Sequence, residues 1–271
     1  MKVILSRKGF DSTYGRQPSP ILPDGTLLSL PIPMENEKVC FENLVHKDKS
    51  YYDIIQELKP KTHLKKSHAC HLDPDLRKEA IKRADQWKPL FGQAGSALSH
   101  LRNQGIAHGD LFLFFGTFKQ TEYDEHRRLQ YKKKAAEQHL IYGYFQVGQL
   151  HTAKQILETK FADHPHAQDS FTAKNQNGIF EATERLSFSP KLPGAGTLNY
   201  HKSLVLTKAN HSKSRWSLPD EFKNLPISYH SGRSFKQEGY FKSAAIGQEF
   251  VITDHPSVHQ WAKNMIKSGI E

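Results

Sequence analysis

Two apolar segments in the middle of the chain constrain its fold more than any other feature of the sequence. Residues 109–118 read GDLFLFFGTF, in which eight of the ten residues are Gly, Leu or Phe, and residues 141–149 read IYGYFQVGQ. The run LFLFF is apolar on both faces, which is typical of a strand in the middle of a sheet, and IYGYFQV is rich in strong β-formers. We therefore predict two adjacent antiparallel strands near the middle of a sheet, with residues 119–139 projecting as their connection.

The segments around this pair predict an α+β fold. Apolar residues recur at helical spacing in residues 50–60, 73–87, 96–105 and 255–269, whereas short strand-like runs occur at 2–5, 178–188, 202–207 and 247–253. These elements alternate without regular βαβ spacing, which favours a mixed, strongly curved sheet flanked by helices. We expect one domain over residues 1–271, with a basic insert at 119–139.

Composition narrows the class of protein. Hydrophobic residues make up 37% and charged residues 24% of the 271 residues, which is typical of a folded globular protein. The formal net charge of +10 favours partners rich in phosphate. Cys40 and Cys70 are too few for a disulfide framework, and no apolar run reaches the roughly 20 residues that span a bilayer. We expect a cytoplasmic protein without a membrane span.

The segment HACHLDPD at residues 68–75 concentrates side chains that can bind transition metals. It contains His68, Cys70, His71, Asp73 and Asp75. As the alternative, Asp73 caps a helix over residues 73–87 and Asp75 complements its dipole. No second Cys/His pair with clean metal spacing follows downstream. We therefore expect the capping role, with no metal, and the sequence identifies no cofactor.

A second histidine group lies in HPHAQD, at residues 164–169. His164 and His166 would face the same way on an extended strand. In that arrangement they could act as general acid and base, or bind a phosphate when protonated. The alternative is an exposed loop with a proline between two solvated histidines.

The loop SRKGFDSTYG, at residues 6–15, follows the first predicted strand and is a candidate ligand site. Loops at the carboxyl ends of strands often carry ligand contacts. An arginine can bind a phosphate through two hydrogen bonds, and an aspartate or serine can read a base or ribose edge. The polar side chains that point to a ligand here are Arg7, Lys8, Asp11, Ser12 and Tyr14. Alternatively, Asp11 and Ser12 only satisfy the loop backbone.

The insert between the two apolar strands carries a cluster of cations interleaved with tyrosines. Its residues are Arg127, Arg128, Lys132, Lys133 and Lys134, with Tyr123 and Tyr131 among them. Such a cluster can neutralise phosphates, and a tyrosine ring offers a face for an unstacked base. The alternative is a solvated hairpin with no ligand.

Several segments resemble, in order, the nucleotide modification associated domain family of the third type. They are residues 1–33, HLDPDL at 71–76, GDLFLFFGTF at 109–118, YGYFQVG at 142–148 and GQEFV at 247–251. The resemblance spans residues 1 to about 252 and implies a nucleotide or nucleic-acid context without supplying a mechanism. The matching positions are Arg7, Gly9, Phe10, Asp11, His71, Asp73, Asp75, Gly109 and Asp110, whereas Thr117 departs from the bulky residue expected there.

The strand pair is also similar to PUA-like domains, which read flipped or modified bases on a curved barrel. That analogy adds a PUA-like partial barrel as the specific form of the expected sheet. It rests on the form of one strand pair and supports no function by itself.

Three functions fit these observations. The first is an enzyme of a nucleic-acid modification system that acts on a nucleotide or modified base, in DNA or RNA. The second is a non-catalytic reader of modified nucleic acid, and the third is a scaffold subunit that binds other proteins of such a system. An enzyme needs titratable groups in one cleft, whereas a reader needs an aromatic slot.

For the site we predict that side chains at the ends of elements line one cleft. The candidate catalytic residues are Asp11, His71, Asp73 and Asp110, with Arg7 and Lys8 as phosphate ligands and Tyr14 and Tyr131 as base-stacking residues. The alternative is a set of separate capping aspartates that never meet.

Overall fold

The two apolar segments form the middle of a large mixed sheet. In the computed structural model, which describes residues 1–245 and 249–270, β8 (Leu111–Tyr123) pairs antiparallel with β10 (Gln138–His151). Every residue of β8 from Leu111 to Phe118 is buried, as expected of a strand covered on both faces. The predicted pairing is confirmed, although the projecting connection is shorter than residues 119–139 because both strands extend into it.

Within the described residues the main sheet has nine strands, with the order β18-β1-β8-β10-β11-β7 along its path. β1 lies parallel to β8, whereas β2 and β9 pair with the far half of β8, and β14 pairs with β10. The remaining strands of this sheet are β1 (Val3–Arg7), β2 (Ser19–Ile21), β7 (Leu90–Ala94), β9 (Leu129–Tyr131), β11 (Asn177–Ala182), β14 (Ala195–Thr197) and β18 (Glu249–Ile252).

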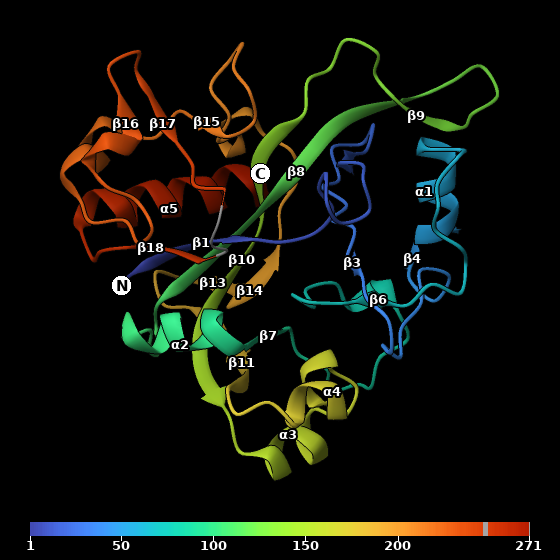
Figure 1. Ribbon diagram of the computed structural model, residues 1–271, viewed down its shortest axis with the longest axis horizontal. Coiled ribbons are helices and arrows are strands. Elements are labelled where there is room, and N and C mark those ends of the chain that lie inside the picture. The colour runs from blue at the N-terminus through green and yellow to red at the C-terminus, as the bar shows by residue number, and fades with distance from the viewer. Residues whose placement is uncertain (246–248, 271) are drawn as a thin grey trace.

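The path from β18 to β7 has two ends and does not close (Figure 1). The sheet is mixed, as expected, but it is not strongly curled, so the predicted strong curvature is absent and the PUA-like partial barrel is not confirmed. Shorter strands form small sheets around it. They are β3 (Ile32–Pro33) with β6 (Cys70–His71), β4 (Val45–His46) with β5 (Lys49–Ser50), β12 (Arg185–Leu186) with β13 (Ser189–Pro193), and β15 (Arg215–Trp216), β17 (Tyr240–Lys242) and β16 (Phe235–Lys236).

Five α-helices occur among the described residues: α1 (Tyr51–Leu58), α2 (Gly95–Asn103), α3 (Lys154–Lys160), α4 (Asp169–Thr172) and α5 (Pro256–Ile270). The helices predicted near α1, α2 and α5 are confirmed. Ser50 caps α1, because its hydroxyl accepts a hydrogen bond from the Asp53 amide at 3.1 Å. Among the described helices, none combines the length and the apolar character needed to cross a bilayer.

Two of the predicted helices and strands do not form. Residues 73–87 form no α-helix and contain only a 3₁₀ turn at Lys78–Ala80. The reason is a tertiary pairing that overrides helix propensity: the backbone of Asp75 exchanges two hydrogen bonds with Leu90, at 3.0 and 3.1 Å. The predicted strand at residues 202–207 is instead a 3₁₀ turn at Lys202–Leu204 followed by a single bridge from Val205 to Leu140. Of the strand predicted at 247–253, residues 247 and 248 lie outside the described part of the chain.

Apolar side chains form one large cluster on β8 and β10 and two smaller ones. One of the smaller clusters joins α1 to the loops between β1 and β7, and includes Phe10 and Phe41. The other packs α3 against β11 and contains Leu157, Phe161 and Ile179. That last cluster fixes the segment from residue 161 to 168, which carries the second histidine group.

His139 gives the fold a pH dependence. This buried residue of β10 accepts a hydrogen bond from Trp216 Nε1 at 3.1 Å, and burial lowers its pKa to about 3. An unfolded histidine has a pKa of about 6.5, so below that pH the unfolded chain binds a proton that the folded chain excludes. The contribution of His139 to the free energy of unfolding is therefore complete above pH 6.5. It is lost at about 1.4 kcal/mol per pH unit as the pH falls toward 4.

We expect His139→Gln to lose this part of the pH dependence, measured by urea unfolding at pH 7.5 and 5.0. The exposed His126 provides the control, because His126→Gln should keep the wild-type slope. Equal slopes for wild type and His139→Gln would contradict the assignment.

Candidate functional site

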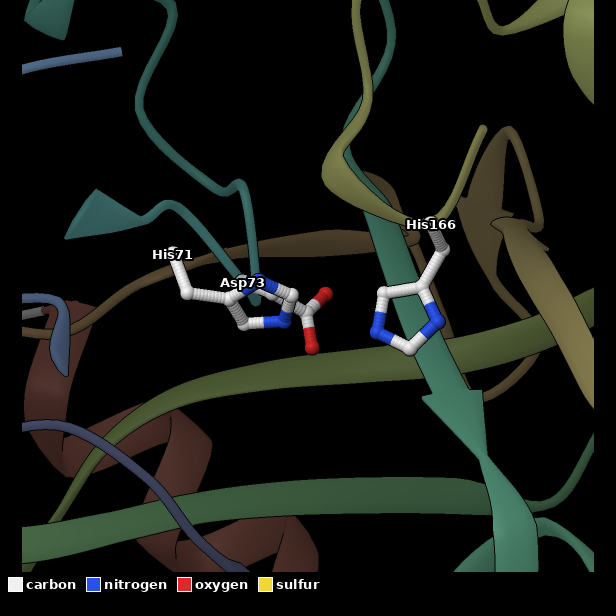
Figure 2. A group of neighbouring side chains, drawn as sticks. All are labelled: His71, Asp73 and His166. Carbon is white, nitrogen blue, oxygen red and sulfur yellow. The ribbon is translucent and has the colours of Figure 1, made fainter. Parts of the chain in front are cut away.

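Three side chains that are far apart in the sequence converge in the interior of the protein. His71, Asp73 and His166 each offer one ligand-type atom, and these three atoms all lie within 4.8 Å of one another. Figure 2 shows His166 facing Asp73 and His71 across a small common space. Both histidines are buried, and only 3% of the Asp73 side chain is exposed. We call these three residues the His–Asp–His cluster.

The first half of this cluster is held by strand pairing and a tight turn. His71 lies on β6, opposite Ile32 of β3, and the Asp73 amide donates a hydrogen bond back to the His71 carbonyl at 2.9 Å. The Gly92 amide on β7 donates to Asp73 Oδ1 at 2.7 Å. Asp73 therefore does not cap a helix, and its carboxylate is fixed by a strand 19 residues further along the chain.

The second half comes from a short 3₁₀ turn at Pro165–Ala167. The His166 amide donates to His164 Nδ1 at 3.2 Å, and Asn177 Nδ2, at the start of β11, donates to the His166 carbonyl at 2.7 Å. The His166 ring lies directly over Gly92, where an added Cβ would come within 2.2 Å of it. A glycine at this position of β7 is what allows the ring to reach Asp73.

Hydrogen bonds fix the orientation of both imidazole rings. His71 Nδ1 is 2.7 Å from Glu37 Oε1, and His166 Nδ1 is 2.8 Å from Asn177 Oδ1. An ionised Glu37 carboxylate can only accept a hydrogen bond from His71. The Asn177 side chain donates through Nδ2 to the His166 carbonyl, so its Oδ1 is the acceptor for the His166 ring. In both contacts Nδ1 of the histidine therefore carries the proton. In the neutral form of each ring, the Nε2 atom then presents its lone pair. Gln168 in turn donates to the other oxygen of Glu37 at 2.9 Å.

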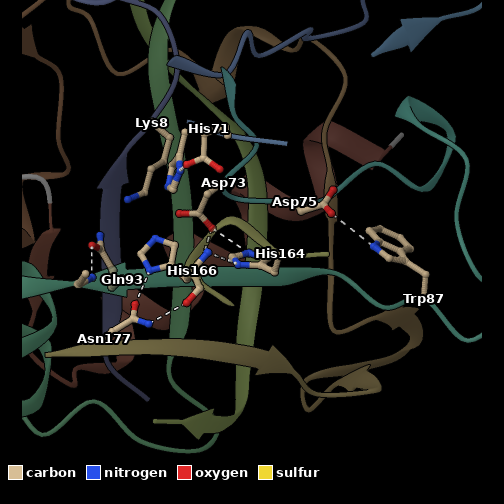
Figure 3. Close-up of polar contacts among 12 residues, drawn as sticks. Lys8, His71, Asp73, Asp75, Trp87, Gln93, His164, His166 and Asn177 are labelled. Carbon is tan, nitrogen blue, oxygen red and sulfur yellow. Dashed lines mark hydrogen bonds and ion pairs between the residues drawn. The ribbon is translucent and has the colours of Figure 1, made fainter. Parts of the chain in front are cut away.

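Further polar side chains are buried beside the cluster (Figure 3). His164 Nε2 is 3.5 Å from Asp73 Oδ1, and Lys8 Nζ is 3.2 Å from Glu249 Oε1, which also accepts a hydrogen bond from Gln93. Within the described part of the chain, His164 Nε2 and Glu249 Oε2 are buried and have no hydrogen-bond partner. A buried polar atom without a partner is costly, so a ligand or water that bonded to these two atoms would stabilise the region.

Electrostatics separates the protonation states of Asp73 and His166. Burial alone would raise the pKa of Asp73, but His164, His166 and Lys8 together outweigh it and hold this pKa well below its ordinary value. Burial lowers the pKa of His166 to about 3. At neutral pH the cluster therefore contains a carboxylate next to a neutral imidazole. This combination suits a general base or a ligand for a cation.

Two surface hollows adjoin the residues that orient the cluster. One, of about 140 Å³, is lined by Asn177 and by three cations, Arg102, Lys154 and Lys174. Lys174 Nζ lies 4.0 Å from the centre of the Phe171 ring, and that ring packs on His166. The other hollow, of about 540 Å³, is lined by Gln168 together with Asn36, Lys38, Glu158, Ala162, Ala167, Asp169 and Ser170.

The structure separates Asp11 and Asp110 from this cluster and from each other. Asp110 precedes β8 and accepts hydrogen bonds from the backbone amides of Lys2, at 2.7 Å, and Ala107, at 3.0 Å. Asp11 follows β1 and accepts from the amides of Thr13 and Tyr14, both at 2.7 Å. Because β1 runs parallel to β8, these carboxylates lie at opposite ends of the strand pair. Of the four candidate catalytic residues, only His71 and Asp73 come together.

The remaining predicted residues of the first loop have partners of their own. Arg7 donates to the carbonyls of Ala244, at 2.7 Å, and Ala245, at 3.1 Å, and Lys8 turns inward to Glu249 near the cluster. Tyr14 is exposed, whereas Tyr131 is half-buried with its hydroxyl donating to the Pro18 carbonyl at 2.5 Å. The Tyr131 ring packs against the apolar cluster that includes Phe10 and Phe41, and Lys119 Nζ lies 5.5 Å from its centre, so it is less accessible than the ring of Tyr14.

The basic insert is a solvent-exposed hairpin. β9 folds back on the end of β8, and all five cations, Arg127, Arg128, Lys132, Lys133 and Lys134, are exposed. Arg128 pairs with Asp124 at 3.0 Å, so part of the positive charge is neutralised locally. We call residues 124–137 the basic hairpin.

Several residues of the site escaped sequence reasoning. The sequence groups His164 and His166 in HPHAQD, but nothing local connects this segment to HACHLDPD. Glu37, Gly92, Gln93 and Asn177 carry no motif, and Glu249 lies in the GQEFV segment without standing out as a candidate. Glu37 follows β3, which pairs with the strand of His71, and the other residues reach the cluster through the pairing of β7 with β11 and of β1 with β18.

Comparison with known proteins gives one match. The family model described as nucleotide modification associated domain 3 matches residues 2–253, which include every residue of the cluster and the residues around it. No curated protein and no solved structure matches the chain.

Asp110 should act as a structural carboxylate. Removing both acceptors in Asp110→Ala leaves two backbone amides without partners, which should lower the free energy of unfolding by about 1–3 kcal/mol. Asp110→Asn keeps one acceptor and should cost less. Asp11→Ala is the control, because water can replace the carboxylate in its exposed turn. Urea unfolding measures all three, and a wild-type stability for Asp110→Ala would contradict this role.

Proposed function

Because the chain belongs to the family described as nucleotide modification associated domain 3, we propose that it is an enzyme that acts on a nucleotide or a modified base of DNA or RNA. The observation that carries the proposal is the convergence of His71, Asp73 and His166 in one buried polar region. Titratable side chains with displaced pKa values that meet in one place are typical of catalytic sites.

The same geometry favours an enzyme over a reader of modified bases. A reader needs an aromatic slot that holds a flipped base. Of the two tyrosines proposed for stacking, Tyr131 packs its ring against an apolar cluster beside Lys119, and Tyr14 lies on an exposed turn. The ring nearest the cluster, Phe171, is packed between His71, His166 and Lys174. The open sheet gives no support to the barrel of a PUA-like reader.

The cationic hollow offers a place for the phosphate of such a substrate. Arg102, Lys154 and Lys174 line it, and Lys154 alone among them has a carboxylate partner, Glu158 at 3.5 Å, within the described residues. Asn177 belongs both to this hollow and to the hydrogen bond that orients His166. A phosphate bound here would lie next to Asn177, the residue that orients the His166 ring.

Asp73→Asn should abolish turnover while leaving the fold intact, because the amide keeps the Oδ1 acceptor for Gly92 and removes only the charge. We expect a loss of about 10²–10⁴-fold, the usual contribution of a catalytic acid or base. The assay follows mass changes in a panel of 5′-nucleotides and of DNA and RNA digests by liquid chromatography and mass spectrometry. Asp220→Asn, at an exposed carboxylate paired with Lys223, is the control.

The outcomes separate the three classes of function. Loss of turnover with retained nucleic-acid binding supports the enzyme. Binding without turnover by the wild type would favour a reader, and neither binding nor turnover would favour a scaffold subunit. Unchanged turnover in Asp73→Asn would remove the cluster from the reaction.

We further propose that the basic hairpin contacts the phosphate backbone of a long substrate. It lies at the opposite end of the molecule from α3 and α4, which flank the cluster (Figure 1). Contacts there would therefore add affinity for a polymer without touching the reacting nucleotide. Its five exposed cations support this role.

Replacing Arg127, Arg128, Lys132, Lys133 and Lys134 with Gln should weaken binding to DNA or RNA and flatten its salt dependence. Each lost phosphate contact should reduce the slope of log K against log salt by about 0.7–0.9. Turnover of a mononucleotide should not change. Lys191→Gln with Lys236→Gln, two exposed lysines away from the hairpin, is the control. An unchanged slope in a fluorescence-anisotropy titration would show that the hairpin is only solvated.

A further inference from the structure

We propose that His71, Asp73 and His166 bind one first-row transition-metal dication, Zn²⁺ or Fe²⁺. The inference deepens the proposed function, on which it rests for the reaction but not for the binding itself. Two imidazoles and one carboxylate are a ligand set that these ions prefer, and three protein ligands leave coordination positions open for water or substrate. A closed structural site would instead use four protein ligands.

The positions of the ligand atoms support a single ion. They already lie within 4.8 Å of one another. An ion bound at about 2.0–2.2 Å from each ligand would draw them together by roughly 1 Å, which small rotations of the side chains can supply. Asp73 Oδ1 is engaged by the Gly92 amide, so Oδ2 is the oxygen presented to the ion.

The orientation of the two rings is that of metal-bound histidines. A metal-binding histidine usually donates its other N–H to a carboxylate or a carbonyl oxygen, which fixes the tautomer and aims the lone pair. Glu37 does this for His71 and Asn177 does it for His166. Each orienting residue is itself held, Glu37 by Gln168 and Asn177 by the His166 carbonyl.

The charges buried in this region also call for a cation. Glu37, Asp73 and Glu249 bring three carboxyl groups whose side chains are no more than 3% exposed. The ion pairs of the described residues supply one lysine here, Lys8, and it binds Glu249. Burying a carboxylate without a compensating charge costs several kcal/mol. A dication between His71, Asp73 and His166 would balance the charge of Asp73 and of the neighbouring Glu37.

His164 has a buried ring nitrogen beside the proposed ion. Its Nε2 is buried, has no hydrogen-bond partner among the described residues, and lies 3.5 Å from Asp73 Oδ1. Its Nδ1 accepts the His166 amide, so Nε2 carries the ring proton of the neutral form. We assign His164 as a hydrogen-bond donor to the oxygen of a water or substrate bound to the metal. It is a positioning residue and not a ligand.

The test is metal binding by the full chain, measured without any nucleotide. After chelator treatment, the protein is titrated separately with Zn²⁺, with Fe²⁺ under anaerobic conditions, and with Co²⁺ as a spectroscopic probe. We expect one ion per chain by elemental analysis, a visible absorption band with Co²⁺, and a rise in melting temperature on metal addition. Asp73→Asn should lose the bound ion and the Co²⁺ band.

A second variant and a matched control keep the test decisive if Asp73→Asn should misfold. Glu37→Gln removes an orienting carboxylate and no ligand, so it should weaken metal binding by about 10–100-fold with a wild-type circular dichroism spectrum. His68→Ala is the control, because His68 belongs to the same HACH segment but its ring accepts the Lys65 amide, at 3.3 Å, and is not part of the cluster. It should bind metal as the wild type does.

The outcomes distinguish this inference from the proposed function. Metal binding by a chain that turns over no nucleotide would support the metal site and remove the proposed enzyme. A folded wild-type chain that binds none of the three ions would overturn the metal site, whatever its activity. Equal affinity in wild type, Asp73→Asn and Glu37→Gln would also overturn it, because binding would then lie elsewhere.

Discussion

The structure depends on the burial of both faces of the β8–β10 pair. A strand that is apolar on both sides cannot lie at a surface, so every other part of the chain must cover it or extend it. β10 is long enough to do both. Its first part pairs with β8, and after irregularities near Gly143 and Gly148 its last part pairs with β11. β11 then pairs with β7. The strand β7, which carries Gly92 of the site, is thus joined to the central strand β10 through β11.

The cluster lies where the sheet ends. β7 is the last strand of the main path, so its outer side is free for loops rather than for another strand. The Gly92 amide of β7 donates a hydrogen bond to Asp73 in the loop before it, and the His166 ring lies over the same glycine. A free strand edge usually needs protection against pairing with other chains. Here the residues that cover the edge of β7 belong to the candidate site. The same contacts therefore protect the edge and hold the site together.

How much of this could be predicted follows from how local each signal is. The pairing of β8 with β10 was predictable because strands with such apolar runs are stable only in the middle of a sheet, where both faces are buried. α1, α2 and α5 were predictable from helical spacing. Residues 73–87 have the same spacing, but the exchange of hydrogen bonds between Asp75 and Leu90 prevents the helix, and no local pattern announces that exchange. His71 and Asp73 were identified as candidates, yet their partner His166 was left in a separate group. The chain joins the two groups only through the order β10-β11-β7.

That misplaced helix also explains why a metal was not expected. If Asp73 capped a helix, its carboxylate would accept hydrogen bonds from the backbone amides at the start of that helix. Capping would then be sufficient to explain an aspartate at this position. In the fold, one amide engages Asp73 Oδ1 and no helix follows. The charge remains, in the interior, between two imidazoles whose protons point away from it toward Glu37 and Asn177. Rings turned that way offer lone pairs toward the space beside Asp73 instead of donors, and a cation there would bind both lone pairs and the carboxylate. The orientation of the two rings and the ionised state of Asp73 therefore both suit a dication.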